Sequence, residues 1–328
     1  MANPFVLSVL DQSPISEGST GAEALRNTLD LAQLADQLGY HRYWLAEHHG
    51  GTMLAGPSPE VLIGPVAMAT ERIRVGSGGV MLPHYSPLKV AEVFSILAGL
   101  HPGRIDLGLG RAPGTDPHTM FALQRDRRQG SPDDFPEQLA ELLAYLEDDF
   151  PPSHPFRRLA ALPGGDERPD LWLLGSSPQS GAWAAELGLP YSFADFINPA
   201  GGAIAQAYRS RFEPSRRREQ PEVGVCVAAL CAETDEEAQL LSLPWRAAFT
   251  ALRLGRSVSI PSVEKAERFL EEHRPIERRI VVGAPETVRA GLEAVAAEYG
   301  ADELMIVTIT HGHAARRRSY ELIAGLEP

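Results

Sequence analysis

Short apolar runs alternate with longer helical patterns along almost the whole chain, and this alternation is the feature that most constrains the fold. The short runs predict strands, because parallel strands buried on both faces are nearly continuous in apolar residues. Eight strands are expected, at Phe5–Leu10, His41–Ala46, Ile73–Ser77, Ile105–Leu109, Leu171–Leu174, Tyr191–Ala194, Val223–Leu230 and Leu304–Ile309. Apolar residues at helical spacing predict the helices, at Ala22–Leu38, Ser58–Thr70, Pro87–Leu100, Asp134–Leu146, Gln179–Leu187, Ala203–Phe212, within Asp235–Leu254 and Val263–His273, and at Thr287–Tyr299 and Ala314–Ile323.

This number of β/α units favours an α/β protein with a (β/α)8 TIM barrel, formed by one domain over residues 1–328. An open doubly wound sheet is the alternative, although such sheets usually have fewer strands. Insertions are expected at the carboxyl-terminal face of the barrel. The Pro-rich stretch Phe150–Pro169 is too long for an ordinary loop, and we interpret it as an insertion over the barrel mouth. Pro275–Pro285 is interpreted as a second excursion before the last unit.

The formal net charge of -13 argues against general affinity for nucleic acid or for anionic membranes. No segment reaches the roughly 18 to 20 apolar residues that a membrane span needs, and Met1–Leu10 lacks the pattern of a signal peptide. Cys226 and Cys231 lie in one apolar run at an odd spacing, which places them on opposite faces of a strand. We expect two free core thiols and a cytoplasmic protein.

Four of the predicted strands end in unusual sequences. In a barrel, functional groups lie at the carboxyl ends of the strands. Here these ends read EHHGG at 47–51, GSGG at 76–79, GRAPGTD at 110–116 and GSSPQS at 175–180. We therefore expect the functional site to be built from these four stretches.

The first of these ends carries two consecutive histidines. Alternation along a strand directs Glu47 and His49 to one side and His48 to the other, so the two imidazoles are poorly placed to share a metal. The close pair His311 and His313 has no supporting carboxylate or Cys cluster, and we predict no metal site. A histidine satisfied within a loop is the simplest alternative. Because the pair occupies a catalytic position of barrel enzymes, His48 is a candidate catalytic residue.

The ends of the fourth and fifth predicted strands together suggest an anion site. Arg111 directly follows an apolar strand, and an arginine there is a natural partner of phosphate or carboxylate. Ser176, Ser177 and Ser180 lie at a predicted helix start, where hydroxyls and free N–H groups bind anions. Simple N-capping would explain one of these serines, but it does not require all three. Neighbouring strands would bring Arg111 and these serines together.

Glycines dominate the remaining end. Gly78 and Gly79 form either a plain turn or a bare backbone surface on which a flat ring can stack. Combined with a phosphate site, this surface fits a phosphorylated planar cofactor such as FMN lying across the barrel mouth. Pyridoxal phosphate would also fit in outline, but it needs a Schiff-base lysine. Lys89 and Lys265 both fall in helical patterns, which disfavours pyridoxal phosphate.

Several stretches resemble the bacterial luciferase-like flavin monooxygenases, in the FMN-linked branch labelled alkanal-monooxygenase-like. They are YWLAEHH at 43–49, IRVGSGGVMLP at 73–83, LHPGRIDLGLGRAPGTD at 100–116, GSS at 175–177 and AAELGLP at 184–190. The resemblance spans essentially the whole chain and is weakest over 150–169 and 239–279. It implies a barrel that uses reduced FMN as a co-substrate.

The resemblance also implies residue roles. His48 matches the histidine that supports the flavin-peroxide chemistry, and Gly78-Gly79 matches a non-proline cis peptide that packs against the isoalloxazine. Arg111 and Ser176 match positions at the FMN phosphate. Ser180 matches a phosphate position too, but the loop after Ser176 differs from the family pattern. At Gly110 the luciferase α subunit carries a reactive Cys, so the resemblance does not imply light emission.

The reaction implied by the resemblance begins when free reduced FMN binds and O₂ adds at the flavin C4a carbon. His48 then hydrogen-bonds the peroxide or moves a proton for it, and the peroxide oxidises a small organic substrate. No nicotinamide-binding motif is visible, so a separate NAD(P)H-flavin reductase is expected to supply the reduced flavin. Family members are commonly dimers packed through their early helices, and the resemblance implies a homodimer here.

Two alternatives stay open at this point. One is an oxidoreductase of the same fold that uses the deazaflavin F420 for hydride transfer. The other is a non-catalytic flavin-binding protein. The EHH and GRAPGTD stretches look more like the FMN branch, and His48 argues against a protein that only binds flavin.

Overall fold

Parallel strands close into a barrel in the computed structural model of the protein, which describes residues 5–111, 116–123, 134–159, 161–276 and 278–326. The ring consists of β1 Val6–Asp11, β2 Arg42–Leu45, β3 Arg74–Met81, β4 Ile105–Gly110, β5 Asp170–Gly175, β6 Tyr191–Ala194, β7 Val223–Cys231 and β9 Glu303–Val307. Each strand pairs with the next in this order, and β9 pairs with β1 to close the ring. The predicted eight-stranded barrel is confirmed, and the open-sheet alternative is wrong.

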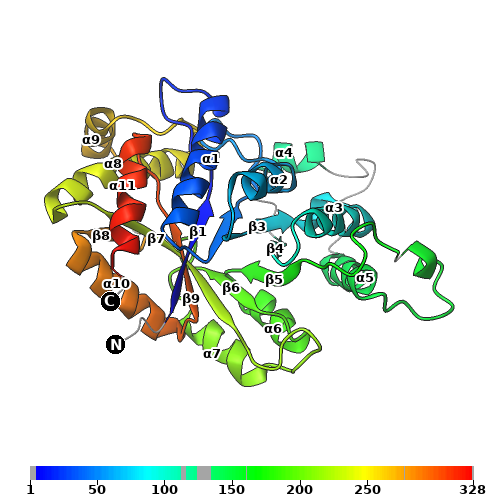
Figure 1. Cartoon of the computed structure of the whole chain (residues 1–328). Coiled ribbons are helices and arrows are strands. Elements are labelled where there is room, and N and C mark those ends of the chain that lie inside the picture. The colour runs from blue at the N-terminus through cyan, green and yellow to red at the C-terminus, as the bar shows by residue number, and fades with distance from the viewer. Residues whose placement is uncertain (1–4, 112–115, 124–133, 160, 277, 327–328) are drawn as a thin grey trace.

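Helices surround the strands on the outside (Figure 1). They are α1 Gly21–Gln37, α2 Pro59–Ala69, α3 Pro87–Leu100, α4 Pro117–Leu123, α5 Phe135–Glu147, α6 Pro178–Glu186, α7 Gly202–Arg211, α8 Asp235–Arg253, α9 Val263–Glu272, α10 Pro285–Tyr299 and α11 His313–Ala324, with short 3₁₀ turns at Leu82–His84 and Arg157–Leu159. Their starts follow local rules: Thr20 and Glu23 form a capping box at α1, and Thr234 caps α8. Proline begins several others, because its missing N–H costs nothing there.

A short strand was missed by the sequence analysis. Within Pro275–Pro285, Val281–Gly283 forms β8, which pairs with the end of β7 outside the closed ring. The interpretation of this stretch as a plain excursion is therefore wrong. Three residues between two prolines are too few to display a strand periodicity.

The Pro-rich stretch Phe150–Pro169 lies far from the position expected for it. It joins the end of α5 to the start of β5, and the N–H of Gly164 donates to Ser95 Oγ on α3 at 2.8 Å. None of its described residues lines the cavity at the carboxyl ends of the strands. A segment that follows a helix and leads into a strand belongs to the amino-terminal end of the barrel, so the prediction of an insertion over the mouth is wrong.

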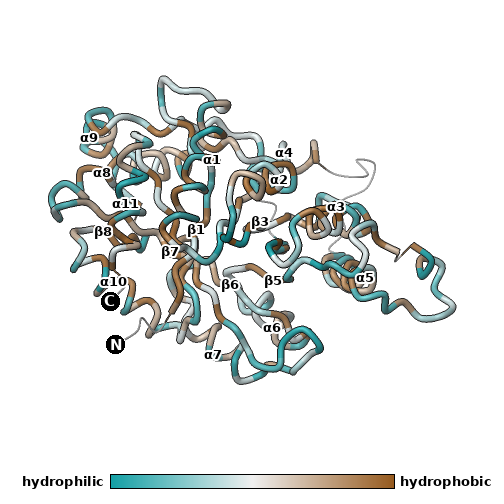
Figure 2. The backbone as a smooth tube through the Cα atoms, in the orientation of Figure 1, coloured by the Kyte–Doolittle hydropathy of each residue, from teal (hydrophilic) through white to brown (hydrophobic). Residues whose placement is uncertain are grey.

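Hydrophobic residues gather on the central strands and on the inner sides of the helices, while the outer loops are largely hydrophilic (Figure 2). One apolar cluster fills the space between the strands and the helices, and a second fills the barrel interior. Cys231 belongs to the first and Cys226 to the second, and both thiols are free. The expected core thiols on opposite faces of one strand are confirmed.

The barrel interior has a charged layer beneath an apolar one. Arg42 Nη1 lies 3.0 Å from Asp106 Oδ2, and Arg42 Nε lies 2.9 Å from Glu303 Oε2, all three side chains being almost fully buried. Above them, Trp44 and Trp172 meet edge to face with ring centroids 5.4 Å apart. Alternation along β2 points Arg42 and Trp44 to the same side. These two layers fill the barrel toward the amino-terminal ends of the strands and leave the carboxyl-terminal end for the site.

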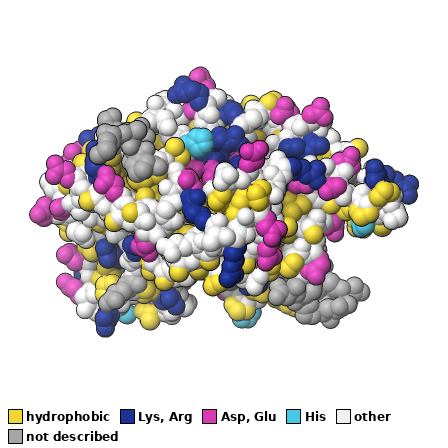
Figure 3. Space-filling model, turned by 90° about the horizontal axis from the view of Figure 1, so that it is seen from below, with side chains coloured by type: hydrophobic (Ala, Val, Ile, Leu, Met, Phe, Trp, Pro, Cys, Tyr) yellow, Lys and Arg dark blue, Asp and Glu magenta, His cyan; other side chains and the backbone are white. Residues whose placement is uncertain are grey.

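The outer surface carries mixed charge. On the face seen in Figure 3, Lys and Arg side chains are scattered among Asp and Glu side chains. Within the part of the chain that the structure describes, no helix is long and apolar enough to cross a membrane.

Candidate functional site

A cavity of about 400 Å³ opens at the carboxyl ends of the strands. It is walled by the ends of β1 to β7 and the loops that follow them. Its lining residues are Leu10, Gln12, Ala46, Glu47, His48, Gly78, Gly79, Met81, Gly110, Arg111, Leu174, Gly175, Ser176, Ser177, Ser180, Ser192, Ala194, Phe196, Ile197 and Cys226. Every predicted site residue is among them, so the structure brings together side chains that are more than 130 positions apart in the sequence, from His48 to Ser180.

One end of the cavity combines Arg111 with the start of α6. Ser177 is the N-cap of this helix, and its hydroxyl accepts from the N–H of Ser180 at 3.4 Å. Arg111, which directly follows β4, places its guanidinium carbon 5.5 Å from the ring centroid of Trp183 on α6. A helix N-terminus facing an arginine offers both N–H donors and positive charge, which is the donor set that a phosphate requires.

Ser180 differs from the other two serines. Its side chain is buried, and its hydroxyl donates to the carbonyl of Ser177 at 2.9 Å and lies 3.0 Å from the phenolic oxygen of Tyr191. The Ser180 hydroxyl is thus already engaged in the wall. Ser176 and Ser177 are the better placed hydroxyls for an anion at this end.

A bare backbone surface forms the opposite wall. The Gly78-Gly79 peptide bond is cis, and the β3–β4 register shifts between Ser77 and Val80. A Cβ at Gly78 would lie 2.5 Å from Leu10 Cδ1, and a Cβ at Gly79 would lie 2.7 Å from a backbone carbonyl oxygen. No side chain fits at either position without displacing its neighbours. The wall is therefore flat, as a stacked ring requires.

His48 lines this cavity, and its Nδ1 is a buried atom that has no hydrogen-bond partner among the described residues. Burial, and to a lesser extent the nearby His49, lower the pKa of His48 to about 4. The imidazole is therefore neutral near neutral pH. A buried polar atom without a partner is costly unless a ligand supplies one.

His49 is directed elsewhere. Its Nε2 lies 2.8 Å from Glu47 Oε1, and Glu47 Oε2 accepts from the N–H of Met81 at 3.0 Å. Glu47 thereby joins the end of β2 to the end of β3. The expected separation of His48 from His49 is confirmed. Among the described residues, no group of three or more His, Cys, Asp or Glu is arranged to hold a metal ion.

Some lining residues escaped the sequence analysis. Gln12 follows β1, and its buried Oε1 has no hydrogen-bond partner among the residues described, so its strand-end position could have identified it. Phe196 lines the cavity from the loop after β6 and Cys226 from β7, and the N–H of Phe196 donates to the carbonyl of Cys226 at 3.2 Å. No local motif distinguishes these two from ordinary core residues.

The fold is shared with solved flavin and deazaflavin enzymes. Apo-MsnO8 superposes with a TM-score of 0.88 at 42% identity over 98% of both chains. The oxygenating constituent of 3,6-diketocamphane monooxygenase from Pseudomonas putida, in complex with FMN, has a TM-score of 0.72 at 20% identity over 99% of this chain and 97% of that one. An F420-dependent secondary alcohol dehydrogenase has a TM-score of 0.65 at 13% identity over 98% of each. The last two likenesses concern the fold alone.

The chain belongs to the luciferase-like monooxygenase family, whose model matches residues 5–303. A luciferase-like monooxygenase of Escherichia coli strain K12 is 43% identical over 97% of this chain and 96% of that protein. The N-acetyl-S-alkylcysteine monooxygenase of Bacillus subtilis is 39% identical over 97% of both chains. The family resemblance expected from the sequence is confirmed.

Proposed function

We propose that the protein is a monooxygenase that binds reduced FMN and uses O₂ to oxidise a small organic substrate. In the overall reaction one oxygen atom of O₂ enters the substrate, the other leaves as water, and reduced FMN supplies the two electrons. The observation that carries this proposal is His48, which lines the cavity and whose buried Nδ1 has no hydrogen-bond partner among the described residues. A protein that merely bound flavin would have no need of such a group.

The cavity residues fit FMN in outline. Arg111, Ser176 and Ser177 would hold the phosphate at the start of α6, with Ser180 supporting them from the wall. The side-chain-free surface at Gly78 would accept the flat ring system.

His48 would hold or move a proton at Nδ1 during the reaction. Because the pKa of His48 is lowered to about 4, the neutral imidazole is available throughout the physiological range. Apolar lining residues such as Leu10, Leu174 and Ala194 would keep water from the reacting atoms.

We propose a homodimer formed through α2 and α3. Both helices are rich in apolar residues, and they contact one another. Four large side chains on them are exposed: Val61 by 65%, Met68 by 81%, Ile96 by 48% and Leu100 by 68%. Exposed apolar side chains gathered on two packed helices are typical of a surface that a partner covers. Sedimentation of the wild type beside Met68→Glu tests this surface, and a monomeric wild type would contradict it.

We also propose that a separate NAD(P)H-flavin reductase provides the reduced flavin, inside the cytoplasm. The B. subtilis relative is named for an N-acetyl-S-alkylcysteine, which suggests thioethers as first substrates to try. Aldehydes and ketones complete the panel.

The cofactor is tested by anaerobic titration of the purified protein with reduced FMN, reduced F420 and reduced riboflavin. We expect tightest binding of FMN. Product analysis with isotopically labelled O₂, reduced FMN and the substrate panel then tests the reaction, with incorporation of one labelled atom expected. Preference for F420, or oxidation without label, would instead support the hydride-transfer alternative.

A further inference from the structure

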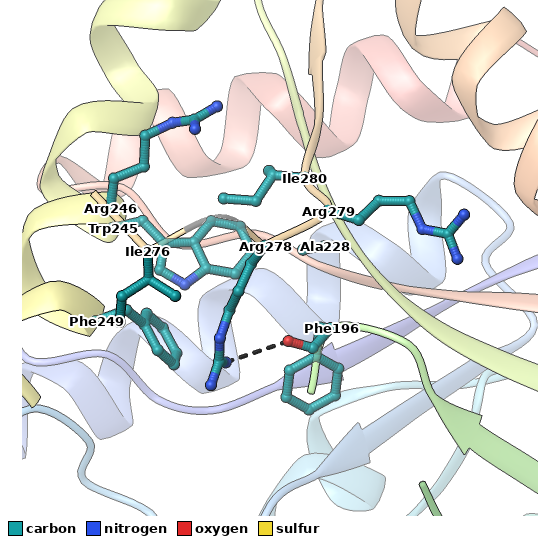
Figure 4. Close-up of a pocket in the computed structure, with 9 residues that line it drawn as sticks. All are labelled: Phe196, Ala228, Trp245, Arg246, Phe249, Ile276, Arg278, Arg279 and Ile280. Carbon is teal, nitrogen blue, oxygen red and sulfur yellow. Dashed lines mark hydrogen bonds between the residues drawn. The ribbon is translucent and has the colours of Figure 1, made fainter. Parts of the chain in front are cut away.

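A second, much smaller hollow adjoins the main cavity. It has a volume of about 20 Å³ and is lined mainly by apolar and aromatic side chains (Figure 4). Phe196 belongs to the walls of both spaces, so the two spaces adjoin at this one residue. The other walls come from α8, with Trp245 and Phe249, and from the segment before β8, with Ile276 and Ile280.

Arg278 places its charge in this apolar hollow. Its guanidinium points between the rings of Phe249 and Phe196 (Figure 4). Nη1 of Arg278 donates to the backbone carbonyl of Phe196 at 3.2 Å, and the guanidinium carbon lies 4.9 Å from the ring centroid of Phe249. Among the described residues, no carboxylate forms an ion pair with Arg278. A guanidinium has five N–H donors in a planar fork, and the bond to Phe196 uses one of them among the described residues.

The neighbouring arginines behave differently. Arg279 forms ion pairs with Asp195 and Glu298, so these two carboxylates already have a cationic partner. Arg246 also lines the hollow, but its guanidinium points away from it, and its Nε donates to Ser242 Oγ at 3.1 Å. Arg278 is thus the arginine of the three whose charge both faces the hollow and lacks a counterion.

The surroundings of Arg278 favour an added negative charge. Partial burial and the like charge of Arg253 lower the pKa of Arg278, which means that the protein environment destabilises its cationic form. An incoming anion would relieve this cost and would form charge-assisted hydrogen bonds with the free N–H groups. The overall charge of -13 makes such an uncompensated cation at the mouth unusual for this chain.

We propose that the oxidised substrate carries a carboxylate, and that Arg278 binds this carboxylate while the reacting part of the substrate lies in the main cavity. This inference rests on the proposed function. The carboxylate is the anion that suits the site, because the hollow is small and the planar guanidinium of Arg278 matches a planar carboxylate. The aromatic rings of Trp245 and Phe249 would contact the apolar atoms next to that carboxylate. Arg278 then determines specificity and takes no part in the oxygen chemistry.

Calorimetric titration with a matched pair of probes, octanoate and octanamide, tests the proposal. The two have nearly the same shape and differ in charge. We expect the wild type to bind octanoate at least about 10-fold more tightly than octanamide, as one partly desolvated charged hydrogen-bond pair provides. Arg278→Gln is expected to weaken octanoate binding by about 10- to 100-fold and to leave the affinity for octanamide unchanged. Arg246→Gln, on the same hollow, is the matched control and should retain the wild-type preference.

Arg278→Lys keeps the charge but not the planar fork, and should retain part of the preference even if the glutamine variant fails to fold. Equal binding of acid and amide by the wild type, no binding of either, or an equal loss in both arginine variants would overturn the proposal. The titrations are run with and without FMN. Retained preference for octanoate in a protein that does not bind FMN would refute the proposed cofactor and leave the carboxylate site intact.

Discussion

His48 and His49 are consecutive in the sequence but have opposite environments. Nε2 of His49 lies 2.8 Å from a carboxylate oxygen of Glu47, whereas Nδ1 of His48 is buried and has no hydrogen-bond partner in the part of the chain that the structure describes. The alternation of side chains at the end of β2 produces this contrast. It makes His48 available for chemistry and gives His49 a structural part, in which it helps Glu47 to hold the end of β3.

Replacing His48 should therefore affect the reaction much more than flavin binding. We expect His48→Ala to reduce product formation by about 100-fold or more, as loss of a general acid or base does, with a change of at most a few-fold in the affinity for reduced FMN. Steady-state turnover with anaerobic titration measures both. His49→Ala is the adjacent control and should weaken thermal stability instead. Equal activity of the His48 variant and the wild type would remove the catalytic role.

The low pKa of His48 gives a stability that depends on pH. Its pKa is about 4 in the folded protein, below the ordinary value of 6.5, so protons bind more readily to the unfolded chain. The stabilising effect is complete above pH 6.5 and is lost as the pH falls toward 4, by up to about 3 kcal/mol. Urea unfolding between these limits should show a smaller loss for His48→Gln than for the wild type. Parallel curves for the two proteins would contradict the lowered pKa.

The proposed phosphate site, formed by Arg111 and the start of α6, can be tested with two flavins that differ only in the phosphate. We expect Arg111→Gln to weaken binding of reduced FMN by about 10- to 100-fold, because a charged hydrogen-bond partner is lost, and to leave reduced riboflavin unchanged. Ser177→Ala should act in the same direction but less strongly. A loss of affinity for both flavins in Arg111→Gln would mean that the arginine supports the fold of the mouth.

The flat wall at Gly79 should not accept a side chain. A Cβ there would lie 2.6 Å from Leu174 Cδ1 and 2.7 Å from the carbonyl oxygen of Gly108. We expect Gly79→Ala to cost about 1 to 3 kcal/mol of stability and to weaken reduced FMN binding by more than about 10-fold. Gly21→Ala, whose added Cβ would meet only ordinary contacts at 3.8 Å, is the control. Unchanged FMN affinity in Gly79→Ala would exclude this wall as the ring surface.

The charged layer below the site should matter for stability alone. Arg42→Met would leave Asp106 and Glu303 buried without their partner, and we expect a loss of about 3 to 5 kcal/mol. Removing the exposed pair of Lys265 and Glu17 by Lys265→Ala should cost less than about 1 kcal/mol. Chemical unfolding of both variants gives the comparison, and similar losses would contradict the burial of the Arg42 network.

The strands of the ring could be predicted because most are short, largely buried and mainly apolar. β8 could not, since Val281–Gly283 is too short for any periodicity and is fixed by its pairing with β7. The stretch Phe150–Pro169 was assigned to the wrong end of the barrel because its length received more weight than its place between a helix and a strand. Its packing against Ser95 on α3 is a tertiary contact, which a local sequence pattern does not predict.

The candidate site divides in the same way. His48 and Arg111 could be predicted, because a barrel exposes whatever follows its strands at one end. Phe196 and Arg278 could not, because the loops that place Phe196 at the cavity and Arg278 at the smaller hollow depend on packing against α8 and β8. Ser180 illustrates a third case, since its position was predicted but its bond with the Tyr191 hydroxyl was not.

In the proposed function, this cavity protects reduced FMN and uses it in the presence of O₂. The most direct measurement is rapid mixing of the anaerobic complex with oxygenated buffer, followed by the absorbance of the flavin. We predict that oxidised FMN returns much more slowly from the wild-type complex than from free reduced FMN, and that His48→Ala shortens this delay. Return of oxidised FMN at the rate of the free flavin, in wild type and variant alike, would contradict the claim.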